Sequence, residues 1–191
     1  MNLTRPTFLR LGGLAALASA LLFTASTQAP AVDGTKWDWL QDTYWIVKPD
    51  GLPAMAYDIA SGTGIPIRDQ TVYHIERCEY GYLYGRCTSQ YGAAQPRCSR
   101  VVGNVAPDGS VILNFATVDN GVATSVTAAT GRMARVRGEW TMLNQMVSLA
   151  SGGTGFVTHW AHMYQVRPTD PEWHNLPFVH LSVPQFLGQC P

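Results

Sequence analysis

The chain contains 191 residues, and its 13 lysines and arginines balance its 13 aspartates and glutamates, so its formal net charge is zero. Charged residues make up only 14% of the sequence and the basic ones are scattered, which excludes the concentrated basic patch that nucleic-acid binding requires. The same even distribution argues against binding to an anionic membrane surface.

The first residues have the pattern of a secretory signal peptide. Arg5 and Arg10 precede an uncharged run over residues 11–25, and small residues follow near Ala29. A membrane-spanning helix needs roughly 20 consecutive apolar residues, and this run is shorter. We therefore expect this segment to direct export and then to be removed.

Cleavage of the signal peptide defines the domain organisation. We predict a signal peptide over residues 1–29, with cleavage near Ala29 or Ala31, followed by a single domain over residues 30–191. No cysteine lies at the cleavage region to accept a lipid. The expected product is soluble, is not inserted into a membrane after cleavage, and is either secreted or periplasmic.

The remainder of the chain predicts an all-β fold. From Thr43 onwards, β-branched and aromatic runs alternate with turns that contain Gly, Pro, Asn and Asp. Short helical turns are expected only over residues 36–41 and 183–187. The expected strands cover residues 43–48, 54–60, 71–77, 80–89, 98–105, 110–118, 122–127, 132–137, 139–149 and 156–167.

Three short connectors predict how these strands pair. Residues 106–109, 119–121 and 151–155 each join two apolar runs through turns rich in Gly, Asn or Asp, which is typical of hairpins. Successive hairpins form an antiparallel meander, and closure of that meander removes its exposed edges. We therefore predict a barrel of about eight strands, with a β-sandwich as the alternative.

Cysteine placement predicts disulfides. Cys78, Cys87, Cys98 and Cys190 follow the signal peptide, and an even number in an exported chain indicates two bridges. If the strands on either side of residues 90–96 fold back on each other, Cys87 faces Cys98. That pairing leaves Cys78 to join Cys190, although the sequence alone leaves all three connectivities open. The spacing does not fit a four-thiolate zinc site, and no metal site is predicted.

The C-terminal segment, residues 168–191, contains Trp173, Phe178 and Phe186 and is too aromatic for a disordered extension. We expect it to pack across the barrel as a plug or a strap that Cys190 holds in place.

At the level of architecture, the chain resembles the calycin group of barrels, which includes lipocalin- and avidin-like proteins. An aromatic opening segment over residues 34–39 precedes the strand meander. Gly34 and Trp37 are separated by Thr35 and Lys36, whereas lipocalins separate this glycine and tryptophan by a single residue, so no binding residues are carried over from that family. The resemblance implies a pocket at the open mouth of the barrel for a small, largely apolar ligand.

Two candidate catalytic residues lie on one expected strand. Side chains alternate along residues 71–77, so His74 and Glu76 share one face while Tyr73 and Ile75 share the other. A histidine beside a carboxylate is suited to general acid–base chemistry near neutral pH. The alternative, which we favour, exposes His74 and Glu76 to solvent and buries Tyr73 and Ile75.

His159 and His162 point to opposite faces of the expected strand over residues 156–167, which argues against a two-histidine metal site. Aromatic side chains flank His162, and the preceding strand adds tryptophan, methionine and asparagine, a combination that suits a pocket with apolar walls and few polar groups. The alternative is that the histidine and the asparagine are hydrogen-bonded core residues. His162 is also a candidate catalytic residue. The predicted ligand-binding residues are Trp140, Asn144, Trp160, His162 and Tyr164.

Three functions stay open at this point. The leading hypothesis is an exported protein that binds a small apolar or aromatic molecule. The second is a barrel-cavity isomerase, cyclase or lyase that uses a histidine for proton transfer. The third is a secreted protein-binding module that presents Tyr80, Tyr82 and Tyr84 to a protein partner. The sequence contains no phosphate-binding loop, nucleophile elbow or dinucleotide fingerprint, so no cofactor is predicted.

Overall fold

A computed structural model describes residues 33–119, 122–149 and 153–190, which belong to one compact unit. The signal peptide that we expect over residues 1–29, and its cleavage positions at Ala29 and Ala31, lie outside the described residues. None of the helices within the described residues is long and apolar enough to span a membrane.

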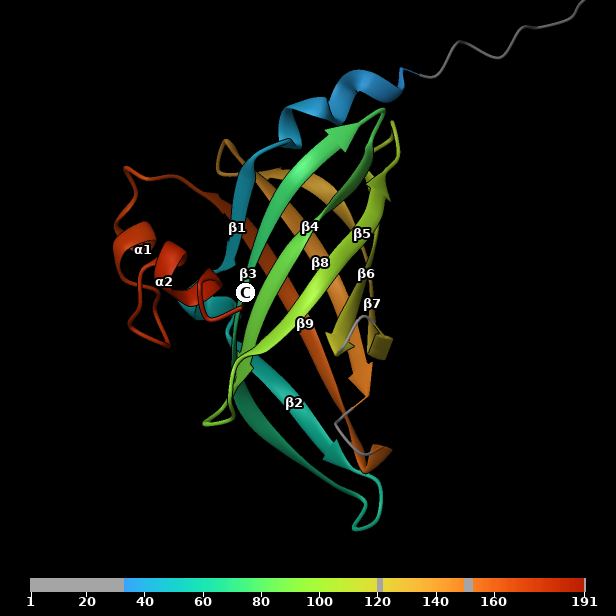
Figure 1. Ribbon diagram of the computed structural model, residues 1–191, viewed down its shortest axis with the longest axis vertical. Coiled ribbons are helices and arrows are strands. Elements are labelled where there is room, and N and C mark those ends of the chain that lie inside the picture. The colour runs from blue at the N-terminus through green and yellow to red at the C-terminus, as the bar shows by residue number, and fades with distance from the viewer. Residues whose placement is uncertain (1–32, 120–121, 150–152, 191) are drawn as a thin grey trace, which may run out of the picture. The chain divides into compact units, whose positions relative to one another are not determined.

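The protein is a closed antiparallel β-barrel (Figure 1), as the sequence predicts. Pairing of β3 with β4 and of β1 with β9 closes the sheet. β1 and β2 occupy successive parts of the gap between β3 and β9, so the ring has eight strands around it and one extra strand. The strands are β1 (Thr43–Val47), β2 (Pro53–Asp58), β3 (Thr63–Glu79), β4 (Tyr82–Tyr91), β5 (Arg97–Val105), β6 (Ser110–Asp119), β7 (Val122–Val136), β8 (Glu139–Leu149) and β9 (Gly155–Val166).

Tight hairpins set the register of the meander. Tyr80 and Gly81 connect β3 to β4 with φ angles of +53° and +78°, and Arg137 and Gly138 connect β7 to β8 with +52° and +86°. Two successive positive φ angles are the signature of the turn that matches the natural twist of a hairpin. A Cβ atom on Gly81 would lie 2.4 Å from the carbonyl oxygen of Val105, so this position requires glycine.

The observed extent of β7 differs from the sequence-based prediction. We expected two strands, over residues 122–127 and 132–137, whereas β7 is continuous. Gly131 lies within the strand and pairs with Asn144 of β8. A Cβ atom on Gly131 would clash first with the Leu143 carbonyl oxygen and then with the side-chain oxygen of Asn144, so the glycine permits the close approach of β8 and does not mark a turn.

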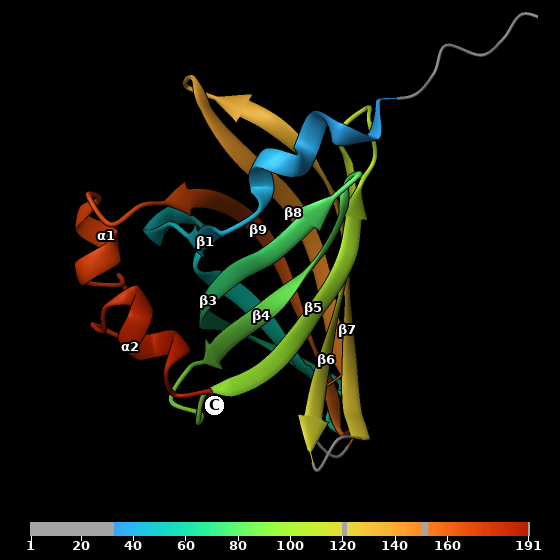
Figure 2. The same cartoon turned by 45° about the horizontal axis from the view of Figure 1, so that its top comes forward.

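The barrel interior is the main hydrophobic core, and one end of it is closed by η1 (Gly34–Leu40), a 3-10 helix drawn in blue in Figure 2. Trp37 of η1 is 2% exposed, and its indole Nε1 donates a hydrogen bond of 2.8 Å to the Ala106 carbonyl oxygen. The ring of Trp37 lies 5.3 Å from Trp140 and 6.2 Å from Trp39, and Trp39 also lies 6.3 Å from Trp45. We call this the tryptophan end.

The C-terminal segment is a strap on the outside of the barrel, and Figure 2 shows its two short helices beside β1 and β3. These helices are α1 (Pro171–His174) and α2 (Val183–Leu187). Leu176 and Phe186 are buried against Ile46 and Val72, which face outward from the sheet. Burial of this apolar area fixes the strap, so β1 and β3 are covered on both faces.

A single disulfide ties the strap to the barrel and corrects the predicted connectivity. Cys98 is bonded to Cys190, and their Cα atoms are 5.3 Å apart. The register pairs Cys87 with Ser99 and Cys98 with Thr88, so Cys87 points into the barrel while Cys98 points outward. The predicted Cys87–Cys98 and Cys78–Cys190 pairs are therefore wrong. Among the described residues, Cys78 and Cys87 carry buried free thiols.

Candidate functional site

Toward the end opposite the tryptophans, the barrel interior becomes more polar. A buried ion pair there joins β3 to β9. The Nδ1 atom of His159 lies 2.8 Å from Oδ2 of Asp69, and both side chains are at most 2% exposed. His159 Nε2 lies 2.6 Å from the Gly51 carbonyl oxygen, and Thr71 donates a hydrogen bond of 2.8 Å to Asp69 Oδ1. We call this the Asp69 end.

The two ring nitrogens of His159 both face oxygen acceptors, which favours the doubly protonated imidazolium. Burial lowers the pKa of His159, but the hydrogen bond and negative charge of Asp69, together with the Gly51 carbonyl, outweigh burial and raise it. Pairing of the imidazolium with the carboxylate is what makes a charge tolerable in this interior.

The described cavity at the Asp69 end is small, with a volume of about 10 Å³. That space holds roughly one water molecule. Burial and the Asp69 charge raise the pKa of Tyr91 to about 12, and the same two causes raise that of Cys87, so both groups are neutral near pH 7. The cavity is lined by Thr71, Cys87, Ser89, Tyr91, Arg97, Ser99, Phe115, Thr117, Thr127 and Met146.

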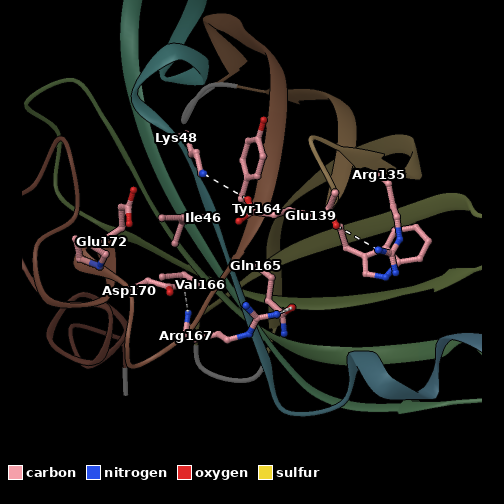
Figure 3. Close-up of a pocket in the computed structure, with 13 residues that line it drawn as sticks. Ile46, Lys48, Arg135, Glu139, Tyr164, Gln165, Val166, Arg167, Asp170 and Glu172 are labelled. Atoms are coloured by element: carbon pink, nitrogen blue, oxygen red, sulfur yellow. Dashed lines mark hydrogen bonds and ion pairs between the residues drawn. The ribbon is translucent and has the colours of Figure 1, made fainter.

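A much larger concave site lies on the outer side of the barrel, between β1, the β7–β8 turn, β9 and the start of the strap (Figure 3). Its volume is about 430 Å³, which is the size of typical small-molecule sites. We call it the strap groove. It is lined by Ile46, Lys48, Arg135, Gly138, Glu139, Trp140, Tyr164, Gln165, Val166, Arg167, Asp170, Pro171 and Glu172.

Two aromatic rings in the strap groove lie under cations. The guanidinium of Arg135 is 4.7 Å from the Trp140 ring centre, and the ammonium of Lys48 is 4.2 Å from that of Tyr164. These distances allow cation–π attraction. Lys48 also lies 3.8 Å from Glu139, which is a weak ion pair because both side chains are substantially exposed.

The charged groups of the strap groove are separated in space. Asp170 and Glu172, from the strap, lie on one side, and Arg135 lies on the opposite side (Figure 3). Asp170 accepts a hydrogen bond of 2.8 Å from the backbone N–H of Arg167, which fixes the start of the strap. The strap side of the groove therefore carries Asp170 and Glu172 with Arg167 beside them, and the side formed by β7 and β8 carries Arg135, Trp140 and Glu139.

The five residues predicted to bind a ligand fall in three places. Trp140 and Tyr164 line the strap groove. Asn144 is inside the barrel and 1% exposed, close to Tyr73. Trp160 is on the outer surface and 65% exposed, and the ring of His162 packs against it edge-on at 4.5 Å. One shared pocket for all five is not what the structure shows.

His74 and Glu76 lie on the outer side of β3, and Tyr73 and Ile75 are buried inside, as we favoured. His74 is not exposed to solvent as we expected, because it is only 9% exposed. His74 Nε2 lies 3.0 Å from Asp42, and its Nδ1 lies 4.0 Å from Glu76. The ring of Tyr44 stacks on His74 at 4.2 Å and meets Trp173 of α1 edge-on at 4.9 Å. These contacts attach the strap to the barrel and do not line the strap groove. His162, the other catalytic candidate, lies apart from them beside Trp160.

Sequence reasoning missed the Asp69–His159 pair and most charged residues of the strap groove. A signal for His159 is present, because it alternates with Ala161 and Met163, which are buried in the barrel. Asp69 and the strap carboxylates have no such signal, since only the three-dimensional fold brings them to their partners. Within the described residues, no three His, Cys, Asp or Glu side chains are grouped as a metal site would require.

Comparison of the chain with protein-family models, with curated proteins and with solved structures finds no match.

Proposed function

We propose that this chain is an exported binding protein, and that its ligand is a small aromatic molecule with both an ammonium and a carboxylate group, held in the strap groove. The observation that carries the proposal is the groove itself, a concavity of about 430 Å³ that holds Asp170 and Glu172 on one side and Arg135 with Trp140 on the other. The signal-like sequence over residues 1–29 and the Cys98–Cys190 disulfide support export, because disulfides persist in oxidising compartments.

The chemistry of the lining selects this ligand class. Trp140 and Tyr164 provide aromatic walls, and Arg135, which lies over the Trp140 ring, is close enough to bind a carboxylate beside it. Asp170 and Glu172 on the opposite side match an ammonium group. A purely aliphatic ligand fits less well, because it would partly remove Arg135, Asp170 and Glu172 from water without offering them a polar group in return.

The barrel interior offers less support for a ligand of this size. The described cavity there has a volume of about 10 Å³, and the tryptophan end is filled by indole rings. The resemblance to calycin barrels therefore supports the architecture, whereas the position of the site is argued from the groove.

A barrel-cavity enzyme has weaker support. The histidine that faces the interior is His159, not His74 or His162, and both of its ring nitrogens are engaged by Asp69 and Gly51. A general base needs a free nitrogen within reach of substrate. The binding function is therefore the better reading of the site.

Isothermal titration calorimetry with phenylalanine and small aromatic dipeptides tests the proposal. We expect binding to weaken about tenfold in Arg135→Gln, which corresponds to about 1.4 kcal/mol, because the carboxylate partner is lost. 3-Phenylpropionate, which lacks the ammonium group, should bind more weakly than phenylalanine, and Glu172→Gln should reduce that difference.

Arg132→Gln is the matched control, because Arg132 is an exposed arginine of the same strand that does not line the groove. Equal losses in the Arg132 and Arg135 variants would indicate a general charge effect. Absence of measurable heat with every compound of the series would contradict the proposed function.

A further inference from the structure

The outer wall of the barrel carries a row of uncharged side chains on six successive strands. Register pairing places these residues side by side from β4 to β9. Directly paired residues of an antiparallel sheet point to the same face, so the row forms one surface. It consists of Tyr82, Asn104, Ile112, Thr130, Gln145 and Trp160, and we call it the Trp160 row.

Aromatic rings are unusually accessible at the two ends of this row. Tyr82 is 73% exposed and Trp160 is 65% exposed. The ring of His162 meets Trp160 edge-on at 4.5 Å, which supports the indole from one side while its surface remains open to solvent. A ring as accessible as that of Trp160 is free to stack against a ligand.

A hollow of about 440 Å³ lies beside Trp160 and is bordered by Thr130, Arg132 and Gln145. Within the described residues, none of these three side chains takes part in a hydrogen bond to another protein group. The hollow therefore combines an open aromatic ring with hydroxyl, amide and guanidinium groups whose hydrogen-bonding capacity is unused.

We propose that this hollow, the Trp160 hollow, binds a saccharide. The C–H face of a pyranose ring is apolar and stacks on an indole, while its hydroxyls are both donors and acceptors. Thr130, Gln145 and Arg132 surround the ring position with groups that match those hydroxyls. Direct contact with an aromatic plane and a few oriented polar groups is the usual composition of a small-molecule site.

The charge pattern favours a neutral glycan chain as the extended ligand. The six side chains of the Trp160 row include no acid or base other than the Tyr82 phenol, and no carboxylate is among the described residues that border the hollow. Neighbouring strands are about 4.8 Å apart, so amides and hydroxyls recur along the row at intervals of molecular size. Arg132 borders the hollow and adds donors for sugar oxygens.

Retention on insoluble cellulose and chitin, together with affinity electrophoresis in a soluble β-glucan, tests the inference with the full chain. We expect at least one of these polysaccharides to bind, and Trp160→Ala to weaken that binding about tenfold. Trp160→Phe should retain part of the affinity, because a phenyl ring still stacks. Gln145→Ala should cause a smaller loss, since it removes hydrogen bonds and leaves the aromatic surface.

Phe156→Ala is the matched control, because Phe156 is an exposed aromatic residue on the same face of β9 and does not border the hollow. An equal loss in Phe156→Ala and Trp160→Ala would show non-specific adhesion and overturn the inference. Failure of all three polysaccharides to bind would overturn it as well.

Two further readouts separate this site from other roles of the same surface. Arg135→Gln, in the strap groove, should leave saccharide binding unchanged, so failure of the groove and failure of the hollow are distinguishable. If the wild-type chain is a dimer by light scattering and Trp160→Ala is a monomer, the row is an interface between copies and the saccharide assignment is wrong.

Discussion

The two ends of the barrel are stabilised by different physical effects. At the tryptophan end, Trp37 is 2% exposed and packs among other indole rings, so its contribution comes from buried apolar area. At the Asp69 end, a carboxylate and an imidazolium are buried together, and their contribution depends on protonation. The stability of the tryptophan end should therefore not depend on pH, whereas that of the Asp69 end should.

Side chains fill both ends of the barrel in the part of the chain that the structure describes. Aromatic side chains occupy the first end, and the second is crossed by a chain of contacts from Thr71 through Asp69 and His159 to Gly51. The space suited to a ligand lies instead where the strap meets the outer wall. The C-terminal segment supplies one wall of this groove, and the barrel strands supply the rest.

The largest effect is expected at the tryptophan end. Trp37→Ala should lower the free energy of unfolding by about 3–5 kcal/mol, because it removes a buried indole and leaves a cavity. Urea denaturation at about pH 5.5 and about pH 8.5 should give the same loss, since the stabilisation that is removed comes from buried apolar area. Trp39→Ala is the control, because Trp39 is 38% exposed, and it should cost clearly less. Equal losses would show that the end is not held by burial.

A loss of stability of similar size is expected at the Asp69 end, and it depends on the charges of Asp69 and His159. His159→Gln should destabilise the fold by about 3 kcal/mol, because it leaves the Asp69 carboxylate buried without its cation. The double variant Asp69→Asn with His159→Gln should be less destabilised than the sum of the two single variants, since the unpaired charge is gone. Chemical denaturation of the wild type, the two single variants and the double variant measures this difference. Strict additivity of the two losses would contradict an ion pair.

The smallest effect is the pH dependence, and its sign follows from the raised pKa of His159. Because the folded pKa exceeds the unfolded value of about 6.5, the ion pair contributes its full stability below that pH and loses it as the pH rises through the folded pKa. Wild-type stability minus that of His159→Gln should therefore fall as the pH rises. Tyr91 and Cys87, which face Asp69, stay neutral throughout because their pKa values are raised. A difference that rises with pH would contradict the assignment.

The barrel could be predicted because its determinants are local. Glycine-containing turns and alternating apolar residues specify hairpins one at a time, and closure follows from the need to pair the edges. The continuity of β7 through Gly131 was missed for the opposite reason, since this glycine is required by the close approach of Leu143 and Asn144 across the hairpin. A residue that makes room for a partner on another strand has no local signature.

The sites could not be predicted as a whole because sequence alternation does not identify the inner face. On β1 and β3, the strap buries outward residues such as Ile46 and Val72, so both faces are apolar. His74 and His159 look alike in the sequence, yet one holds the strap and the other crosses the interior. The disulfide was misassigned for the same reason, because Cys87 and Cys98 lie near each other in the hairpin but on opposite faces.

The positions of the four cysteines determine which thiols are accessible to an oxidant after the barrel has folded. Closure of the barrel encloses Cys78 and Cys87 and leaves Cys98 at the outer surface, where the strap delivers Cys190. An oxidant that reaches the folded barrel therefore meets only one productive pair of thiols. Oxidation that precedes closure would encounter four competing thiols and three ways to pair them. Folding of the barrel before oxidation would therefore favour the Cys98–Cys190 bond, because the other two thiols are then buried.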